Sequence, residues 1–223
     1  MVKMAETDLH ILAAEKVDEQ ALQLVTDVRL QIEQYIARRQ CFLDALVPLP
    51  MDERAPEVVR EMLAAGLQAG VGPMAAVAGA IAQRVGRMLL AGGQVEVIVE
   101  NGGDLYLARN RTCTVAVYAG ESSLSGRLGI SLQPDGMPCG VCCSSGTIGH
   151  SLSMGNADAV VVVASDTALA DAAATRLGNE AGKSRQSINQ ALALAGKIEG
   201  IRGVVIVSGD RLGAWGDIEL VRI

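Results

Sequence analysis

Aromatic side chains are scarce in this sequence of 223 residues, of which they make up 2%. One Trp, one Phe and three Tyr leave little surface on which the bases of a single-stranded nucleic acid could stack. Basic clusters are also scarce, because no run of Lys or Arg extends beyond the short "ARRQ" at 37–40 and the formal net charge is -6. The chain therefore lacks the positive patch that binds a polyanion, and we expect no nucleic acid partner.

Long apolar runs are missing as well. The N-terminal "MVKMAETDLHILAAE" mixes apolar with polar residues and lacks the apolar core of a secretion signal. No later stretch approaches the roughly 18 apolar residues of a membrane span. The five cysteines are odd in number and irregularly spaced, so we expect reduced thiols rather than a disulfide framework. Together these features predict a cytoplasmic protein without membrane contact.

Half of the residues are hydrophobic, and with so few aromatics the core must consist of Ala, Val, Leu, Ile and Met. A chain of this length buries about 70% of its unfolded surface. No segment is rich enough in linker residues to separate two parts, so we expect a single domain over residues 1–223. The long N-terminal helix predicted below has a broad apolar face, which makes a homodimer a reasonable expectation.

Hydrophobic periodicity predicts several helices in the first half of the chain. A strand over 7–15 precedes a long amphipathic helix that starts at Asp18, its expected N-cap, and runs to residue 46. Three prolines in 47–56 end this helix, and a second helix covers 57–67. A third helix starts at Pro73 and ends at Gly92 and Gly93. Its many Ala and Gly residues permit the close approach of another backbone.

Short β-type runs follow over 94–100, 104–110, 113–119 and 126–133, and they predict an antiparallel meander. After the segment "GVCCSSGTIGHSLSMGNADAV" at 140–160, the apolar run 157–165 predicts a strand. A helix ended by Gly178, another over 184–198 and two or three closing strands complete the chain. Helices grouped beside hairpin-linked strands indicate an α+β fold with a largely antiparallel sheet.

One helix face carries polar residues at regular spacing. Thr167, Asp171 and Thr175 recur at i, i+4 and i+8 in "TALADAAATRLG", where most other residues are Ala or Leu. If this face packs inward, the Asp171 carboxylate needs a partner, and a hard cation is a natural one. If the face is solvated, Asp171 is an ordinary surface residue. Spacing alone favours the solvated alternative.

Two glycine-containing segments allow both a structural and a functional interpretation. The pair Gly102 and Gly103 in "ENGGDLYL" suits a hairpin turn, which explains it without a ligand. The alternative is that backbone N–H groups approach a ligand there while Asp104 accepts hydrogen bonds. Similarly, "GVGPMAA" at 70–76 opens a helix that could hold an anion, but it lacks the features of a Walker loop or a dinucleotide fingerprint.

The cysteine-rich segment at 139–150 leaves three alternatives open. One Cys-x-x-Cys pair lacks the further ligands of a zinc or iron–sulfur site. Cys142 or Cys143 could form a nucleophile–base pair with His150. The run "SSGT" could wrap a phosphate. Beside these three, the residues by themselves favour a polar turn with a structural histidine.

In order and spacing, "VENGGDLYL", "SSGTIGHS" and "ADAVVVVASDTALADAAAT" resemble the ApbE-like family of FAD:protein FMN transferases, once called thiamine biosynthesis lipoproteins. The resemblance runs from about Gly70 to Gly178. It implies an α+β fold of duplicated T-fold-like halves, with a flavin nucleotide and magnesium as cofactors. It also implies a hydroxyl-bearing acceptor protein as partner.

The resemblance implies a role for each matching residue. Asp171 and Thr175 resemble magnesium ligands, together with a backbone carbonyl near Ala75. Gly102, Gly103 and Asp104 would hold the nucleotide, and the remaining residues of the cofactor site would lie by the diphosphate or flavin: Ser144, Ser145, Gly146 and Thr147. His150 is the nearby candidate for a general base.

The sequence also departs from the family pattern. The family transferases follow the histidine with Asp-Pro-Arg-Thr-Gly, whereas His150 is followed by "SLSMGNAD". The helix opening "GPMAAVAGA" lacks the family's Lys-Gly-Tyr. The sequence thus resembles a cytoplasmic branch that keeps the metal pair without the transferase signature. Two functions follow as hypotheses: magnesium-dependent FMN transfer from FAD, or flavin or nucleotide binding without transfer, as a protein or as an accessory domain of a redox assembly.

Overall fold

The structure is a computed structural model that describes residues 1–145 and 155–223. Its main sheet has eight antiparallel strands, and a smaller antiparallel sheet has three. In spatial order the main sheet contains β1 (Val2–Met4), β2 (Thr7–Ala13), β3 (Val97–Asn101), β4 (Asp104–Ala108), β7 (Cys139–Ser144), β8 (Ala159–Ala164), β9 (Ile201–Ser208) and β10 (Arg211–Gly216). The smaller sheet contains β11 (Glu219–Arg222), β6 (Leu128–Leu132) and β5 (Cys113–Ala116). This is the α+β fold with an antiparallel sheet that the sequence predicts.

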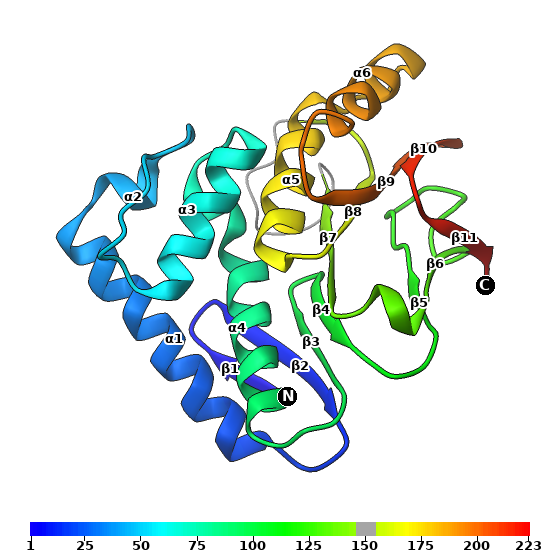
Figure 1. Ribbon diagram of the computed structural model, residues 1–223. Coiled ribbons are helices and arrows are strands. Elements are labelled where there is room, and N and C mark those ends of the chain that lie inside the picture. The colour runs from blue at the N-terminus through cyan, green and yellow to red at the C-terminus, as the bar shows by residue number, and fades with distance from the viewer. Residues whose placement is uncertain (146–154) are drawn as a thin grey trace.

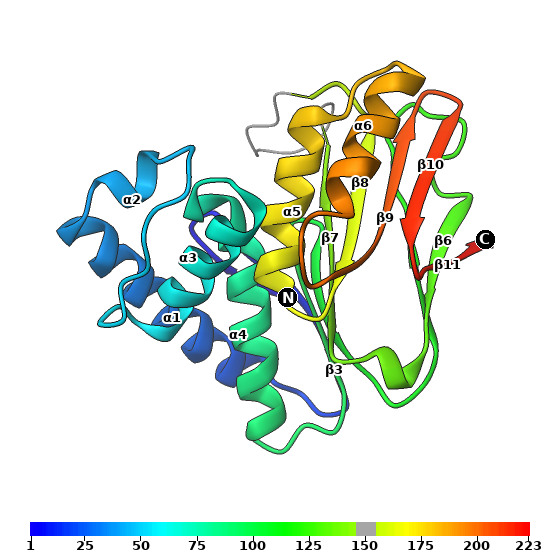
Figure 2. The same cartoon turned by 45° about the horizontal axis from the view of Figure 1, so that its top comes forward.

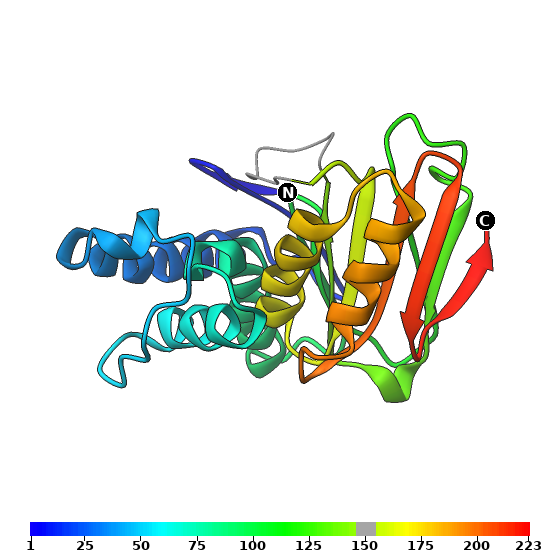
Figure 3. The ribbon, with the colours of Figure 1, turned by 90° about the horizontal axis from the view of Figure 1, so that it is seen from above.

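The helices cover one face of the main sheet, and the smaller sheet covers part of the other (Figures 1, 2 and 3). The helical layer contains α1 (Asp18–Arg38), α2 (Cys41–Asp44), α3 (Glu57–Ala69), η1 (Pro73–Ala76), α4 (Val77–Ala91), α5 (Thr167–Glu180) and α6 (Arg185–Ala195). A further short 3-10 helix, η2 (Pro134–Gly136), precedes β7. The helix α4 contacts β3 and β4, whereas α5 contacts β7 and β8. The larger hydrophobic core lies between helices and sheet, and a second core lies between the two sheets.

The predicted N-terminal helix is shorter than expected. It ends at Arg38 instead of residue 46, and its N-cap is Val17, with Asp18 in the first turn. The chain turns after Arg38 because Phe42 is buried in the core, where its ring packs edge-on against Tyr35 with 5.0 Å between centroids. The prolines at 47–56 do not end this helix, because α1 ends at Arg38 and α2 at Asp44, before the first of them; α3 begins at Glu57, directly after Pro56.

One prediction about apolar length is wrong. The continuous segment Pro73–Ala91, which comprises η1 and α4, is 19 residues long with a mean hydropathy of 1.2, and so satisfies the length and composition of a membrane span. Half of it is buried within the structure, where α4 packs on α1, α5, β3 and β4. A core helix of a soluble protein has the same composition, so this segment is weak support for membrane contact.

The largest differences from the sequence prediction concern the strands. Within the cysteine-rich segment, residues Cys139–Ser144 form a central strand, β7. The predicted meander is interrupted, because β4 pairs with β7 and β5 pairs with β6 in the other sheet. Gly178 does not end its helix: it lies inside α5, where its carbonyl oxygen packs against Gly155, and the helix continues to Glu180.

Candidate metal and nucleotide site

The end of the β3–β4 hairpin carries buried polar side chains toward the helices. Gly102 and Gly103 form a two-residue turn with φ of 64° and 102°, and Asn101 pairs with Asp104 across it. Positive φ at both positions is the requirement of a tight hairpin turn, which glycine meets without strain. The predicted turn is therefore confirmed, and it places Asp104 at the first position of β4.

Asp104 is a buried carboxylate with an unsatisfied oxygen. The residue is 7% exposed, and its Oδ1 has no hydrogen-bond partner among the described residues. Burial raises the pKa of Asp104 well above its usual value, and the charge of Asp171 raises it further. Hydrogen bonds from the Cys142 side chain and the Cys143 backbone lower this pKa in part. Asp104 and Asp171 thus lie close enough for each charge to disfavour the other.

Asp171 approaches the same place from α5. Its Oδ2 accepts a hydrogen bond of 2.9 Å from the backbone N–H of Gly79 in the first turn of α4. No side chain caps α4 locally, so a carboxylate from another helix satisfies one of its free N–H groups. Burial raises the pKa of Asp171 to about 7, although the Gly79 and Ala78 backbone N–H groups lower it in part. The solvated alternative for Asp171 is therefore wrong.

Close contact between α4 and α5 depends on Gly79. A Cβ atom at this position would lie 2.4 Å from the Thr167 carbonyl oxygen and 2.8 Å from the Asp171 Cβ. The close backbone approach that the Ala- and Gly-rich sequence predicts for this helix is thus confirmed. It lets α5 present the buried Thr167 and the half-buried Asp171 and Thr175 toward the neighbouring elements.

These residues fit a hard cation. The buried Asp104, whose Oδ1 has no partner among the described residues, and the half-buried Asp171 are destabilised as anions, and a divalent ion would relieve both. Thr175 follows Asp171 by one turn of α5, and Ala75 lies in η1, which packs against α5. Among residues 1–145 and 155–223, no three His, Cys, Asp or Glu side chains gather as a metal cluster. A cation here would therefore need hydroxyl, carbonyl or nucleotide oxygens as well.

The predicted diphosphate residues are described only in part. Ser144 is buried at the end of β7, on the same face as Cys142, and the Ser145 hydroxyl donates a hydrogen bond of 2.8 Å to the Asp158 carbonyl oxygen. Ser144 thus directly follows Cys143, whose backbone N–H donates a hydrogen bond to Asp104. Gly146, Thr147 and His150 lie outside the described residues.

The cysteines of β7 are protected thiols. Cys142 is fully buried, and its single thiol proton can go to either of two acceptors, the Thr167 carbonyl oxygen at 3.4 Å from Sγ or the Asp104 carboxylate. Burial raises the pKa of Cys139 to about 11 and that of Cys143 to about 12, and it raises that of Cys142 well above its usual value. Thiols with such pKa values stay protonated at neutral pH, so they neither attack as nucleophiles nor bind metal readily.

Sequence reasoning missed several residues of this site. Asn101 is buried and donates a hydrogen bond of 3.1 Å from its Nδ2 to the Ala78 carbonyl oxygen. Gln83 is fully buried and joins Thr167 to Asp166, the N-cap of α5. Asn101 directly precedes the glycine pair, which is the one signal that draws attention to it. The role of Gln83 depends on partners more than 80 positions away, and no local pattern indicates it.

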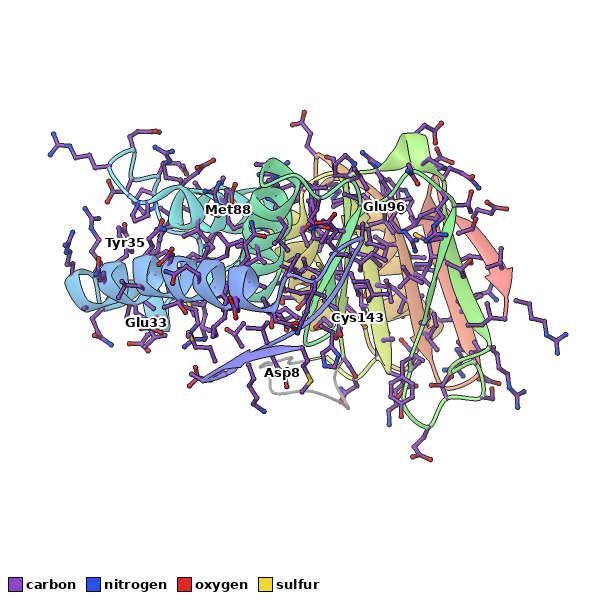
Figure 4. All side chains as sticks on the ribbon, turned by 90° about the horizontal axis from the view of Figure 1, so that it is seen from below. Asp8, Glu33, Tyr35, Met88, Glu96 and Cys143 are labelled. Atoms are coloured by element: carbon purple, nitrogen blue, oxygen red, sulfur yellow. The ribbon has the colours of Figure 1, made fainter. Side chains whose placement is uncertain are left out.

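Two cavities lie away from the carboxylates. They have volumes of about 370 Å³ and 140 Å³, and they are lined by the C-terminal half of β2, the first residues of β3 or the start of α1. Glu96 lines the smaller cavity. In Figure 4 it lies apart from Cys143, whose backbone contacts Asp104 and so marks the position of the candidate site. The chemistry of Asp104 and Asp171, and not cavity size, therefore identifies the candidate site.

The fold and site define an α+β protein with one buried and one half-buried carboxylate between a hairpin and two helices. The family model described as AbpE bacteria matches residues 1–200, and the chain belongs to this family. A UPF0280 protein of Methanosarcina acetivorans is 40% identical over 200 residues, which cover 90% of this chain and 79% of that protein. A UPF0280 protein of Methanocaldococcus jannaschii is 42% identical, covering 92% and 84%.

Solved structures with lower similarity include two flavin transferases. The flavinyl transferase ApbE of Pseudomonas stutzeri, in its apo form, is 21% identical with a TM-score of 0.46, covering 66% of this chain and 51% of that protein. The flavin transferase ApbE of Vibrio cholerae is 14% identical with a TM-score of 0.45, covering 94% and 77%. The matched region thus spans about half the length of the Pseudomonas stutzeri protein.

Proposed function

We propose that this chain binds a flavin nucleotide with magnesium and transfers FMN from FAD to a hydroxyl group of an acceptor. The observation that carries the proposal is the Oδ1 of buried Asp104, which lies near Asp171 and has no partner within residues 1–145 and 155–223. A buried carboxylate beside a half-buried one is costly when both are charged, and a bound cation or proton relieves this cost. Membership of the AbpE family supports a flavin nucleotide as the ligand that accompanies the ion.

Each residue has a role in this proposal. Asp104, Asp171, Thr175 and the Ala75 carbonyl would hold the ion, which would neutralise charge on the FAD diphosphate. The Gly102–Gly103 turn exposes backbone with no Cβ atoms, so a nucleotide can approach it closely.

The transfer is a phosphoryl-type substitution. The acceptor hydroxyl oxygen forms a bond to the FMN phosphorus, the bond from that phosphorus to the bridging oxygen breaks, and AMP leaves with that oxygen. We assign His150 to take the hydroxyl proton, because imidazole titrates near neutral pH.

A second candidate function is flavin or nucleotide binding without transfer. It is favoured by "SLSMGNAD" after His150, where the family transferases carry Asp-Pro-Arg-Thr-Gly. The pair of carboxylates would then serve binding alone, in a free protein or in a redox assembly.

AMP release distinguishes the two functions. Purified protein is incubated with FAD, MgCl2 and an acceptor protein rich in Ser and Thr, and AMP is measured by chromatography. We expect magnesium-dependent AMP release that is lost in Asp104→Asn and Asp171→Asn, which keep side-chain size, and retained in the exposed control Asp210→Asn. FAD binding without AMP release would favour the second function. If calorimetry detects no flavin or nucleotide binding, both functions are wrong.

A further inference from the structure

A single peptide group in α4 connects the two halves of the candidate site. On its carbonyl side, the Ala78 oxygen accepts the 3.1 Å hydrogen bond from Asn101 Nδ2. On its amide side, the Gly79 N–H donates the 2.9 Å hydrogen bond to Asp171 Oδ2. The carbonyl of Ala78 and the N–H of Gly79 belong to the same rigid, planar unit. Asn101 and Asp171 therefore bind opposite sides of one group.

Asn101 lies opposite Asp104 in the hairpin. Asn101 and Asp104 are directly paired, and only the two glycines separate them along the chain. A Cβ atom on either glycine would meet nothing within 4 Å, and within the hairpin the Gly103 N–H donates a hydrogen bond of 3.1 Å to Glu100 Oε1. The buried amide of Asn101, which is 6% exposed, joins this hairpin end to α4 through its hydrogen bond to Ala78.

The Asp171 side of the arrangement is equally fixed. Because a Cβ atom on Gly79 would overlap Thr167 and Asp171, α5 lies directly on the first turn of α4. Hydrogen bonds on both sides of a peptide group also polarise it and so strengthen one another. The relative position of the two carboxylates is therefore set through the Ala78–Gly79 peptide group.

We propose that Asn101 is a positioning residue that fixes the separation of Asp104 and Asp171 and so favours Mg²⁺ over larger cations. This inference rests on the proposed function, in which the two carboxylates hold the ion. Mg²⁺ requires near-octahedral oxygen ligands at about 2.1 Å, whereas Ca²⁺ accepts longer and more variable distances. Loss of the Asn101 hydrogen bond then weakens Mg²⁺ binding more than Ca²⁺ binding.

The test compares Asn101→Leu with Val99→Ala. Asn101→Leu keeps a similar volume and removes the donor, whereas Val99→Ala loses buried packing on the same strand and face without touching the peptide group. Mg²⁺ and Ca²⁺ affinities are measured by competition with Mn²⁺, followed by paramagnetic resonance, on the full chain. Amide hydrogen exchange of residues 77–80 is measured without metal. Asn101→Ala is the second variant if leucine prevents folding.

We expect Asn101→Leu to weaken Mg²⁺ binding about tenfold or more, a typical effect of losing a partner that orients a metal ligand. Ca²⁺ binding should weaken less, and exchange at residues 77–80 should accelerate. Val99→Ala should keep the wild-type ratio of Mg²⁺ to Ca²⁺ affinity. An unchanged ratio in Asn101→Leu, or unchanged exchange at residues 77–80, overturns the positioning role. A wild-type protein that binds neither ion contradicts the proposed metal site itself, while the exchange result still tests the anchor.

Discussion

At the scale of single residues, burial determines which polar groups of this site can react. The thiols of Cys139, Cys142 and Cys143 lie on a central strand and have raised pKa values, whereas Cys41 is exposed on α2. The same burial raises the pKa of the carboxylates, yet an ion can stabilise their charged form. The site thus combines unreactive sulfur with carboxylates that are ready to bind a cation.

Thiol labelling tests the protection of β7. In native protein, we expect an aromatic disulfide reagent to modify Cys41 rapidly, because the thiolate is the reacting species and this side chain is accessible. Cys139, Cys142 and Cys143 should react only after denaturation. The Cys41→Ser variant serves as control and should lack the rapid phase. Rapid reaction of a β7 thiol in that variant would support the alternative in which Cys142 or Cys143 acts as a nucleophile.

Asp104→Asn should have opposite effects on stability and on binding. Above pH 7 without metal, we expect this variant to be more stable than wild type by about 1 kcal/mol or more, since it removes a poorly satisfied buried charge. It should also lose the stabilisation that Mg²⁺ gives wild type. Urea unfolding with and without Mg²⁺ measures both effects, and Asp210→Asn should behave as wild type. A destabilised Asp104→Asn at this pH would contradict the account of the buried charge.

At the scale of elements, the site depends on how closely α4 and α5 approach. We expect Gly79→Ala to destabilise the protein by about 1–3 kcal/mol, because the new methyl group would overlap the Thr167 carbonyl and force the helices apart. Gly136→Ala is the control, since its Cβ would meet only Arg202 at 3.6 Å. Equal denaturant midpoints for the two variants would show that the helices are not so tightly packed.

The elements themselves could largely be predicted from the sequence, because periodicity and Pro or Gly boundaries are local. The strand β7 could not, since Gly, Cys and Ser have no strong strand preference and β7 is stabilised by β4 and β8 on either side. The β4–β7 pairing joins segments more than 30 positions apart. Helical spacing singles out Asp171 but favours a solvated surface role for it, and only the family resemblance implies a metal ligand; Asn101 depends on a carbonyl group that only the folded chain brings near.

At the scale of the whole molecule, three acidic groups make stability depend on pH. Burial raises the pKa of Asp171 from 3.8 to about 7, that of Glu61 from 4.5 to about 7, and that of Asp104 in the same direction. An acid with a raised pKa in the folded state binds more protons folded than unfolded. Its contribution to stability is thus complete below the unfolded pKa and is lost as pH rises through the folded pKa.

We therefore expect the free energy of unfolding of metal-free protein to decrease as pH rises from about 4 to about 7, the window between the ordinary and shifted pKa values. Saturating Mg²⁺ should oppose the share of this decrease in stability that comes from Asp104 and Asp171. The ion favours their charged forms and binds more tightly as they deprotonate. Mg²⁺ should leave the contribution of Glu61 to the pH dependence unchanged, because this residue lies on α3 between Arg84 and Arg87. Urea titrations of wild type, Asp171→Asn and Glu61→Gln across this range separate the two contributions. A pH profile that Mg²⁺ changes equally in wild type and in Asp171→Asn would show that the ion does not bind at Asp171.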